Sequence, residues 1–213
     1  MKKNKKLLIF IVLIILLLSI VFFIKIYYKN MIIGNNINSK STQEIVDNIL
    51  NMKSYDSNIT VRIISNKNEN TYVINQTNIE NKLFKQEILE PENIKGTMII
   101  YDNGRLNIRN TNLNLNKIYE DYKYITNNQL LLNSFIEDYK NKEIKNIEEN
   151  ENNIVLNVQI DVNKYIISKT LIVDKNTGKP RELQIKDGSQ NTLVYILYNR
   201  IEVNGIKEDK VLS

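Results

Sequence analysis

Apolar residues occupy every position but one in a single stretch near the N-terminus, from Leu7 to Ile24. Ser19 is the exception, and lysines fill four of the first six positions of the chain. At about 1.5 Å per helical residue the stretch is about 27 Å long, close to the hydrocarbon thickness of a bilayer. Because lysines stay on the cytoplasmic side, the pattern predicts a transmembrane signal-anchor helix at 7–24, with the rest of the chain exported.

A cleavable signal peptide is the alternative explanation of the same stretch. Such a peptide has a shorter apolar core, followed by small residues at the cleavage site. Here residues 25–29 (Lys-Ile-Tyr-Tyr-Lys) are bulky, charged and aromatic, as at a membrane interface. We therefore expect an uncleaved anchor. The sequence predicts a cytoplasmic basic tail and anchor over 1–29, a polar juxtamembrane linker over 30–40, and one extracytoplasmic domain over 41–213.

Two segments of the expected domain carry apolar residues at helical spacing. The first opens on a capping-box pattern, Ser-Thr-Gln-Glu at 41–44, and predicts a helix over about 42–53. The second, over about 128–140, places five apolar residues on one helical face. The sequence therefore predicts two amphipathic helices.

Strand patterns dominate the remainder of the domain. The predicted strands are 59–64, 71–76, 82–89, 96–101, 105–109, 142–149, 153–162, 165–174, 181–187 and 191–203. The dipeptide Asn103-Gly104 predicts a tight hairpin, because both residues accept positive φ. Residues 110–126 are ambiguous, and a loop laid over the core is one interpretation.

The faces of the strands predict how the layers pack. The segment 193–198 is apolar on both faces, so a second layer must cover one of them, and the two helices are the available cover. We therefore predict an α+β, mainly β fold. After the transmembrane helix, a strongly curved antiparallel sheet, a half-barrel, is covered on its concave side by helices.

Charge is distributed unevenly along the chain. The whole sequence has 29 basic and 24 acidic residues, a net charge of +5. Residues 1–30 hold six of the lysines and no acid, so the rest of the chain carries 23 basic and 24 acidic residues. The excess positive charge therefore belongs to the anchor, and we expect no nucleic-acid partner for the folded domain.

The absence of histidine and cysteine excludes several kinds of site. Without histidine the chain cannot form a catalytic triad based on imidazole. Without cysteine it cannot form a thiolate nucleophile, a disulfide or a lipidated cysteine, and without either residue it cannot form a His/Cys zinc site. Ser134 and Ser168 have no histidine to activate them. The acidic cluster Glu148, Glu149 and Glu151 falls at a predicted turn, where a solvated hairpin tip is favoured over a cation site or a catalytic carboxylate pair. We expect no catalytic, cofactor or metal site.

Aspartates at predicted turn starts have a structural explanation. Asp102, Asp174 and Asp187 each stand where a carboxylate commonly accepts hydrogen bonds from backbone amides. We therefore assign them to turn capping rather than to catalysis.

Tyrosines offer the best candidates for a partner or ligand surface. Tyr119, Tyr122, Tyr124 and Tyr139 join apolar area to a polar tip, the combination favoured at protein interfaces. The alternative is that these side chains pack the second helix against the sheet. The segment 113–125 is the best single prediction of a binding surface.

Two motifs carry a family resemblance. Residues 89–104 contain Pro-x-x-x-x-Gly from Pro91 to Gly96 and then Tyr-Asp-Asn-Gly, while residues 173–185 contain Asp-x-x-Thr-Gly-x-Pro-x-x-Leu-x-Ile. Both resemble recurrent segments of the lipoprotein-carrier-like (LolA-like) superfamily, and the matching stretches cover most of 42–203. The resemblance implies a half-barrel of antiparallel strands closed by helices.

Among the branches of that superfamily, the chain is most similar to the GerS-type spore germination lipoproteins of clostridia. That resemblance implies a non-catalytic accessory protein, which binds and enables a cortex-modifying N-acetylmuramoyl-L-alanine amidase at the spore envelope. The membrane anchor would replace the lipidated cysteine of those proteins, which this chain lacks. The alternative is a hydrophobic-ligand or lipid-binding protein that uses the space between sheet and helices.

Overall fold

The computed structural model describes residues 41–80, 82–122, 128–163 and 166–206. The predicted anchor at 7–24 and the linker at 30–40 lie outside the described residues. Contacts group Ser41–Ser213 into one compact unit. Within the described ranges, no helix combines the length and the apolar composition that crossing a membrane requires.

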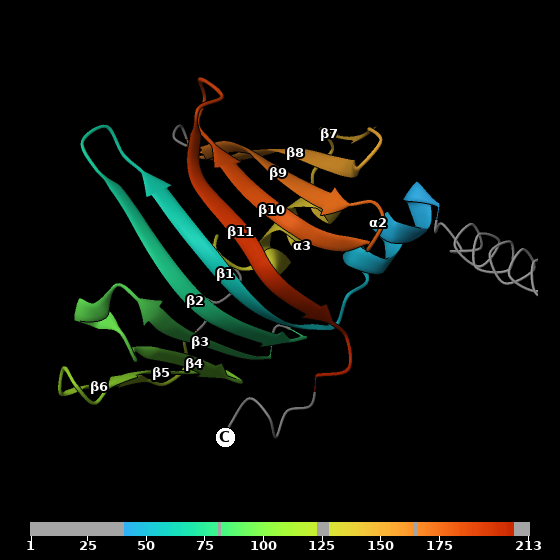
Figure 1. Ribbon diagram of the computed structural model, residues 1–213. Coiled ribbons are helices and arrows are strands. Elements are labelled where there is room, and N and C mark those ends of the chain that lie inside the picture. The colour runs from blue at the N-terminus through green and yellow to red at the C-terminus, as the bar shows by residue number, and fades with distance from the viewer. Residues whose placement is uncertain (1–40, 81, 123–127, 164–165, 207–213) are drawn as a thin grey trace, which may run out of the picture. The chain divides into compact units, whose positions relative to one another are not determined.

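The described part of this unit consists of eleven strands and two α-helices (Figure 1). The strands are β1 (Ser54–Ile64), β2 (Glu69–Ile79), β3 (Leu83–Glu90), β4 (Met98–Asp102), β5 (Arg105–Asn110), β6 (Leu115–Tyr119), β7 (Lys145–Glu149), β8 (Asn153–Asn163), β9 (Ile166–Asp174), β10 (Lys179–Lys186) and β11 (Thr192–Val203). The helices are α2 (Thr42–Leu50) and α3 (Leu132–Asn141), and a 3-10 turn, η1 (Glu92–Ile94), precedes β4. The mainly β, α+β class predicted from the sequence is confirmed.

All eleven strands belong to one antiparallel sheet, in the order β6-β5-β4-β3-β2-β1-β11-β10-β9-β8-β7. Two meanders, β1–β6 and β7–β11, meet where β1 pairs with β11. The first and last strands of the domain therefore lie at the centre of the sheet. Among the described residues the sheet is not closed, so β6 and β7 form its two edges.

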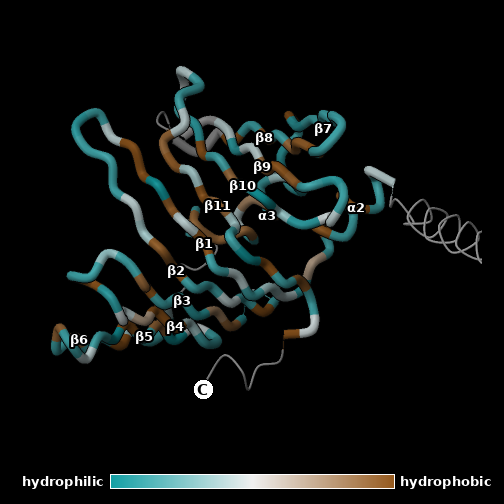
Figure 2. The backbone as a smooth tube through the Cα atoms, viewed as in Figure 1, coloured by the Kyte–Doolittle hydropathy of each residue, from teal (hydrophilic) through white to brown (hydrophobic). Residues whose placement is uncertain are grey.

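Both helices pack against one face of the sheet, which bends around α3 (Figure 1). Over residues 153–160 of β8 the buried side chains alternate with more exposed ones, as the period of two in a strand requires. Figure 2 shows hydrophobic and hydrophilic positions interleaved along the strands of the sheet. The main core joins the helices to the inward-facing residues of the central strands. Its members are Ile45, Val46, Ile49, Tyr55, Ile59, Val61, Ile74, Leu132, Phe135, Ile136, Tyr139, Ile154, Leu156, Val158, Leu171, Val173, Leu183, Ile196, Tyr198 and Ile201.

Helix α2 begins where the capping pattern predicts. The Ser41 hydroxyl accepts a hydrogen bond from the Glu44 amide at 3.1 Å, which satisfies one of the unpaired donors of the first turn. The helix ends at Leu50, three residues before the predicted end, because β1 already starts at Ser54. The sequence pattern therefore located the helix and its first residue but overestimated its length.

Both sequence motifs form tight turns between paired strands. In the β4–β5 hairpin Asn103 and Gly104 have φ values of 45° and 97°, the two positive values that the Asn-Gly signal predicts. In the β9–β10 turn the Asp174 carboxylate accepts hydrogen bonds from the Thr177 amide at 2.7 Å and from its hydroxyl at 2.9 Å. Gly178 follows with a φ of 66°, which a residue with a side chain adopts at a cost.

Replacing Asp174 by alanine is expected to lower the free energy of unfolding by about 1 kcal/mol, because the two hydrogen bonds to Thr177 are lost. These bonds hold the pKa of Asp174 below its usual value of 3.8. The stabilisation by the charged carboxylate is therefore complete above pH 3.8 and is lost as the pH falls through the lower, folded-state pKa. Urea unfolding between about pH 7 and about pH 3 measures both effects.

The matched control for this turn is Asp174→Asn, which keeps an oxygen acceptor and removes only the charge. Its deficit relative to the wild type should shrink on acidification, because the wild-type carboxyl also becomes neutral there. A deficit that stays constant down to about pH 3 would show that the charge of Asp174 does not stabilise the turn.

Candidate interaction surface

Large apolar side chains are exposed mainly at the two edges of the sheet. In the described residues they are Leu113, Ile118, Tyr119, Ile144, Ile147 and Leu197, each more than two-fifths exposed. The first three belong to the β6 edge and the next two to the β7 edge, while Leu197 lies on central strand β11. Exposed apolar groups that cluster in this way indicate interaction sites more strongly than scattered ones do.

Strand β6 pairs on one side only. Its five residues pair with β5, from Asn110 opposite Leu115 to Leu106 opposite Tyr119. Because β6 ends the sheet, no strand among the described residues pairs with its other side. An edge of this kind presents backbone donors and acceptors to which another chain can add a strand.

A buried asparagine fixes the turn that leads into β6. Asn110 is 1% exposed, and its side-chain amide donates to the Lys95 carbonyl at 3.1 Å and to the Thr97 hydroxyl at 2.7 Å. The side-chain oxygen of Asn110 accepts a hydrogen bond from the backbone amide of Leu113 at 3.1 Å. The turn that carries the exposed Leu113 side chain is therefore tied to the loop before β4, which limits its freedom to rearrange.

Two of the predicted tyrosines lie together at the end of β6. The rings of Tyr119 and Tyr122 are 6.3 Å apart and inclined at 49°. Tyr119 is exposed, while Tyr122 is half-buried against a small core formed by Phe84, Leu106 and Leu131. The Tyr122 amide also donates to the Gly104 carbonyl at 2.6 Å, so the aromatic pair is held by the β4–β5 hairpin.

The other two predicted tyrosines do not join this surface in the described structure. Tyr139 is 5% exposed in the main core, 5.7 Å from the Phe135 ring, where burial raises its pKa. This is the helix-packing role that the sequence left open as the alternative. Tyr124 lies outside the described residues. Residues 115–119, which were ambiguous in sequence, form an edge strand rather than a loop over the core.

The opposite edge, β7, is more strongly charged. The Glu149 carboxylate contacts the Lys175 ammonium and the Thr42 hydroxyl, and these hydrogen bonds lower its pKa. Glu148 accepts from the side-chain amides of Asn146 at 2.9 Å and Asn157 at 3.2 Å. Charged residues on an edge strand discourage pairing with a further strand. The β6 edge is therefore the better candidate surface for a partner.

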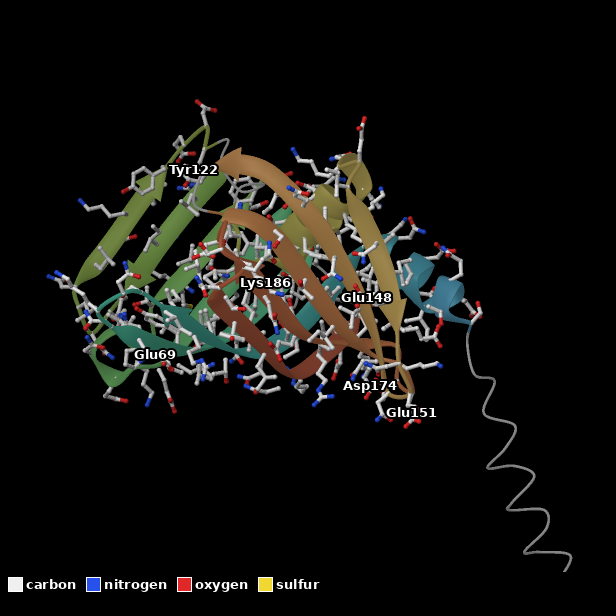
Figure 3. The ribbon with its side chains drawn as sticks, turned by 90° about the horizontal axis from the view of Figure 1, so that it is seen from above. Glu69, Tyr122, Glu148, Glu151, Asp174 and Lys186 are labelled. Carbon is white, nitrogen blue, oxygen red and sulfur yellow. The ribbon has the colours of Figure 1, made fainter. Side chains whose placement is uncertain are left out.

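The acidic cluster spans the end of β7, which holds Glu148 and Glu149, and the β7–β8 turn, which holds Glu151. Figure 3 shows Glu151 and Asp174 at the same end of the sheet, where the Lys175 amide donates to the Asn152 carbonyl at 2.9 Å. The described residues contain no group of three metal-ligating side chains. Asp187 caps its own turn through the amides of Ser189 and Asn191. The Asp102 carboxylate accepts a hydrogen bond from the side-chain amide of Asn103 at 2.8 Å, whereas the sequence predicted one from a backbone amide.

A buried lysine adjoins one of the candidate serines. Lys169 is fully buried on β9, and its ammonium donates to the Ser134 hydroxyl at 2.8 Å and to the Asp138 carboxylate at 2.6 Å. Burial lowers the pKa of Lys169, and Asp138 opposes that shift. Ser134 is only 6% exposed, so this group ties α3 to the sheet rather than facing a substrate. The sequence pattern alone did not predict this contact.

Several solved structures are similar to this chain. An uncharacterized conserved protein from Thermus thermophilus matches with a TM-score of 0.53 at 11% identity, over 82% of this chain and 94% of that one. A chain of the complex between the CwlD amidase from Clostridioides difficile and the GerS lipoprotein matches with a TM-score of 0.43 at 20% identity, over 78% of this chain and 92% of that one. A LolA superfamily protein from Nitrosomonas europaea matches with a TM-score of 0.40 at 12% identity, over 79% and 96%.

The open antiparallel sheet packed on two helices is thus a fold that this chain shares with the Thermus protein. A family model described as "Sporulation protein YdcC-like" matches residues 4–211, and the chain belongs to that family. Membership of this sporulation family agrees with the resemblance to GerS-type spore proteins noted in the sequence. No curated protein matches the sequence significantly.

Proposed function

We propose that this protein is a non-catalytic accessory protein of the spore envelope, anchored in the membrane by residues 7–24. It binds a cortex-modifying N-acetylmuramoyl-L-alanine amidase and enables that enzyme during germination. Membership of a sporulation family supports the process. The sequence resemblance to GerS-type proteins supports the class of partner.

The observation that carries the proposal is the β6 edge. This open strand ends in Ile118 and Tyr119, 45% and 47% exposed, and the half-exposed Leu113 lies in the turn that precedes it. Addition of a strand from the partner would satisfy the free backbone groups of β6, while these side chains would give the contact its apolar area. A tethered protein that only binds needs no catalytic group, which fits the absence of histidine and cysteine.

The lipid-binding alternative requires room between the sheet and the helices. In the described residues that space holds the main core, whose twenty buried side chains include Phe135, Leu156 and Ile196 at 0% exposure. A pocket in the described part of the chain opens instead at the β7–β10 part of the sheet, outside the main core, and most of its lining residues are polar or charged types. This packing favours the accessory function over the carriage of a lipid.

Deletion of the gene is expected to give spores that form normally but keep an unmodified cortex, because the amidase lacks its accessory protein. Muropeptide analysis of purified spores measures the cortex directly. Affinity purification of the tagged full-length protein from sporulating cells should recover the amidase. Complementation with the wild-type gene is the control. Normal cortex chemistry in the deletion strain would contradict the proposal.

A further inference from the structure

A pocket of about 410 Å³ lies at the β7–β10 part of the sheet, a volume within the range of small-molecule sites. Figure 3 shows Lys186 and Glu148 on this part of the sheet, whereas Tyr122 lies toward β6. The polar residues that line the pocket and enter the argument are Asn157, Gln159, Ser168, Thr170, Lys186 and Gln190. The pocket is therefore separate from the β6 edge.

Strand register explains why these polar groups converge. On β9 the side chains of Lys169 and Leu171 point into the core, so Ser168 and Thr170 point to the opposite face. Cross-strand pairing places Ser168 opposite Gln159 on one side and opposite Lys186 on the other. An amide, a hydroxyl and an ammonium thus form one row across three neighbouring strands.

A hydrogen-bonded network fixes one wall of the pocket. The Thr170 hydroxyl donates a hydrogen bond to the side-chain oxygen of Asn157 at 2.7 Å, and the side-chain amide of Asn157 donates one to the Glu148 carboxylate at 3.2 Å. The Asn157 side chain is therefore held in one orientation. Thr170 is itself 6% exposed, so this wall is built into the sheet rather than laid on its surface.

Two groups at the pocket are without a protein partner in the described structure. The Ser168 hydroxyl oxygen is buried and makes no hydrogen bond. Lys186 takes part in none of the ion pairs found between described residues. Its neighbour Asp187 is occupied by the amides of its own turn. A buried polar atom without a partner is costly unless a ligand or water satisfies it.

We propose that this pocket binds a small carboxylate that carries amide or hydroxyl groups beside the charge. Lys186 pairs with the carboxylate, the Ser168 hydroxyl donates a hydrogen bond to it, and the side chains of Gln159 and Gln190 bind the adjoining polar groups. Two sources offer this chemistry at a cell envelope, namely an acidic amino sugar and the C-terminal end of a peptide. The choice of probes rests on the proposed location, but the requirement for a carboxylate does not.

Saturation-transfer NMR with the full-length protein in a zwitterionic, sugar-free detergent tests the proposal. The probes are N-acetylmuramic acid, the dipeptide D-alanyl-D-alanine, and N-acetylglucosamine, which resembles the first probe but has no carboxylate. At least one of the two carboxylates should bind saturably and about tenfold or more tightly than N-acetylglucosamine. The one that binds identifies the source. Saturable binding of neither carboxylate, or equal binding of all three probes, would overturn the proposal.

Three substitutions locate the binding. Lys186→Gln should weaken the bound carboxylate at least about tenfold, because it removes the charge-assisted hydrogen bond. Lys179→Gln removes the same charge from an exposed position on the same strand and should leave affinity unchanged. Ser168→Ala should weaken binding several-fold without lowering stability, since its hydroxyl makes no bond in the folded protein. Unchanged affinity in Lys186→Gln would overturn the proposal.

Carboxylate binding by the pocket and amidase binding by the β6 edge can be tested independently of each other. Lys186→Gln should still co-purify with the amidase, because the β6 edge is untouched. If Lys186→Gln loses carboxylate binding but still recovers the amidase normally, carboxylate binding belongs to the pocket and not to the amidase contact. A wild-type protein that recovers no amidase but binds the carboxylate contradicts the proposed function and leaves the pocket assignment standing.

Discussion

Replacement of Asp138 by alanine is expected to lower the free energy of unfolding of the folded domain by about 3 kcal/mol or more. The substitution leaves the Lys169 ammonium fully buried, with the Ser134 hydroxyl as its one remaining hydrogen-bond partner among the described residues. A buried charge that loses its counter-ion costs far more than a lost surface ion pair does. Urea unfolding of wild type and variant at neutral pH measures the difference.

The control for this prediction is Lys169→Met, which replaces the buried charge by an apolar chain of similar length. It should cost less than Asp138→Ala, because the remaining Asp138 carboxylate is 21% exposed and can be hydrated. A larger loss in Lys169→Met than in Asp138→Ala would contradict this explanation.

The pH dependence of Asp138→Ala provides a second signature. Without its counter-ion the folded-state pKa of Lys169 falls further below the ordinary value of 10.5, so the unfolded chain binds more protons between the two values. Stability of the variant therefore rises with pH in that window, and its deficit shrinks as the pH is raised toward 10.5. A deficit that grows with pH would be inconsistent with a buried ammonium.

Truncation of Tyr119 to alanine is expected to weaken binding of the amidase by about 2 kcal/mol, or about 30-fold in Kd. Tyrosines near the centre of an interface commonly contribute this much, and the Tyr119 ring lies beside the Tyr122 ring. Because the side chain is 47% exposed, its removal should change folding stability little. Biolayer interferometry with immobilised full-length protein and purified amidase gives the affinity.

The matched control for the interface is Leu197→Ala. Leu197 is 44% exposed, comparable to Tyr119, but lies on β11 at the centre of the sheet, away from either edge. The variant should leave amidase affinity unchanged. Equal losses in both variants would indicate a general effect on the fold, and a loss in Leu197→Ala alone would place the interface on the open face of the sheet.

Local signals in the sequence predicted the turns and most strands well. The Asn103-Gly104 hairpin and the Asp174 cap depend on a few adjacent residues, so one short segment contains all the information that specifies them. The alternation along 153–162 likewise located β8 and its buried face. These elements are those in which local preference and tertiary packing agree.

Strand pairing between distant segments and the burial of individual side chains could not be predicted from local sequence signals. Pairing of Tyr55 with Val203 joins the first and last strands and leaves β6 and β7 as edges, and no local pattern specifies this. Tyr119 and Tyr139 look alike in sequence, yet one is exposed on an edge and the other is buried on α3. Lys169 did carry a signal, because it has the same parity as Leu171 on β9 and so must point inward.

Site-specific photo-crosslinking tests whether the β6 edge binds the amidase in the cell. A photoreactive amino acid is placed at Ile118, or at Leu197 as control, in the full-length protein in sporulating cells, and crosslinked partners are identified by mass spectrometry. We expect the amidase to be crosslinked from the Ile118 position and not from the Leu197 position. Crosslinks to the amidase from the Leu197 position alone, or none from the Ile118 position in cells that make both proteins, would contradict it.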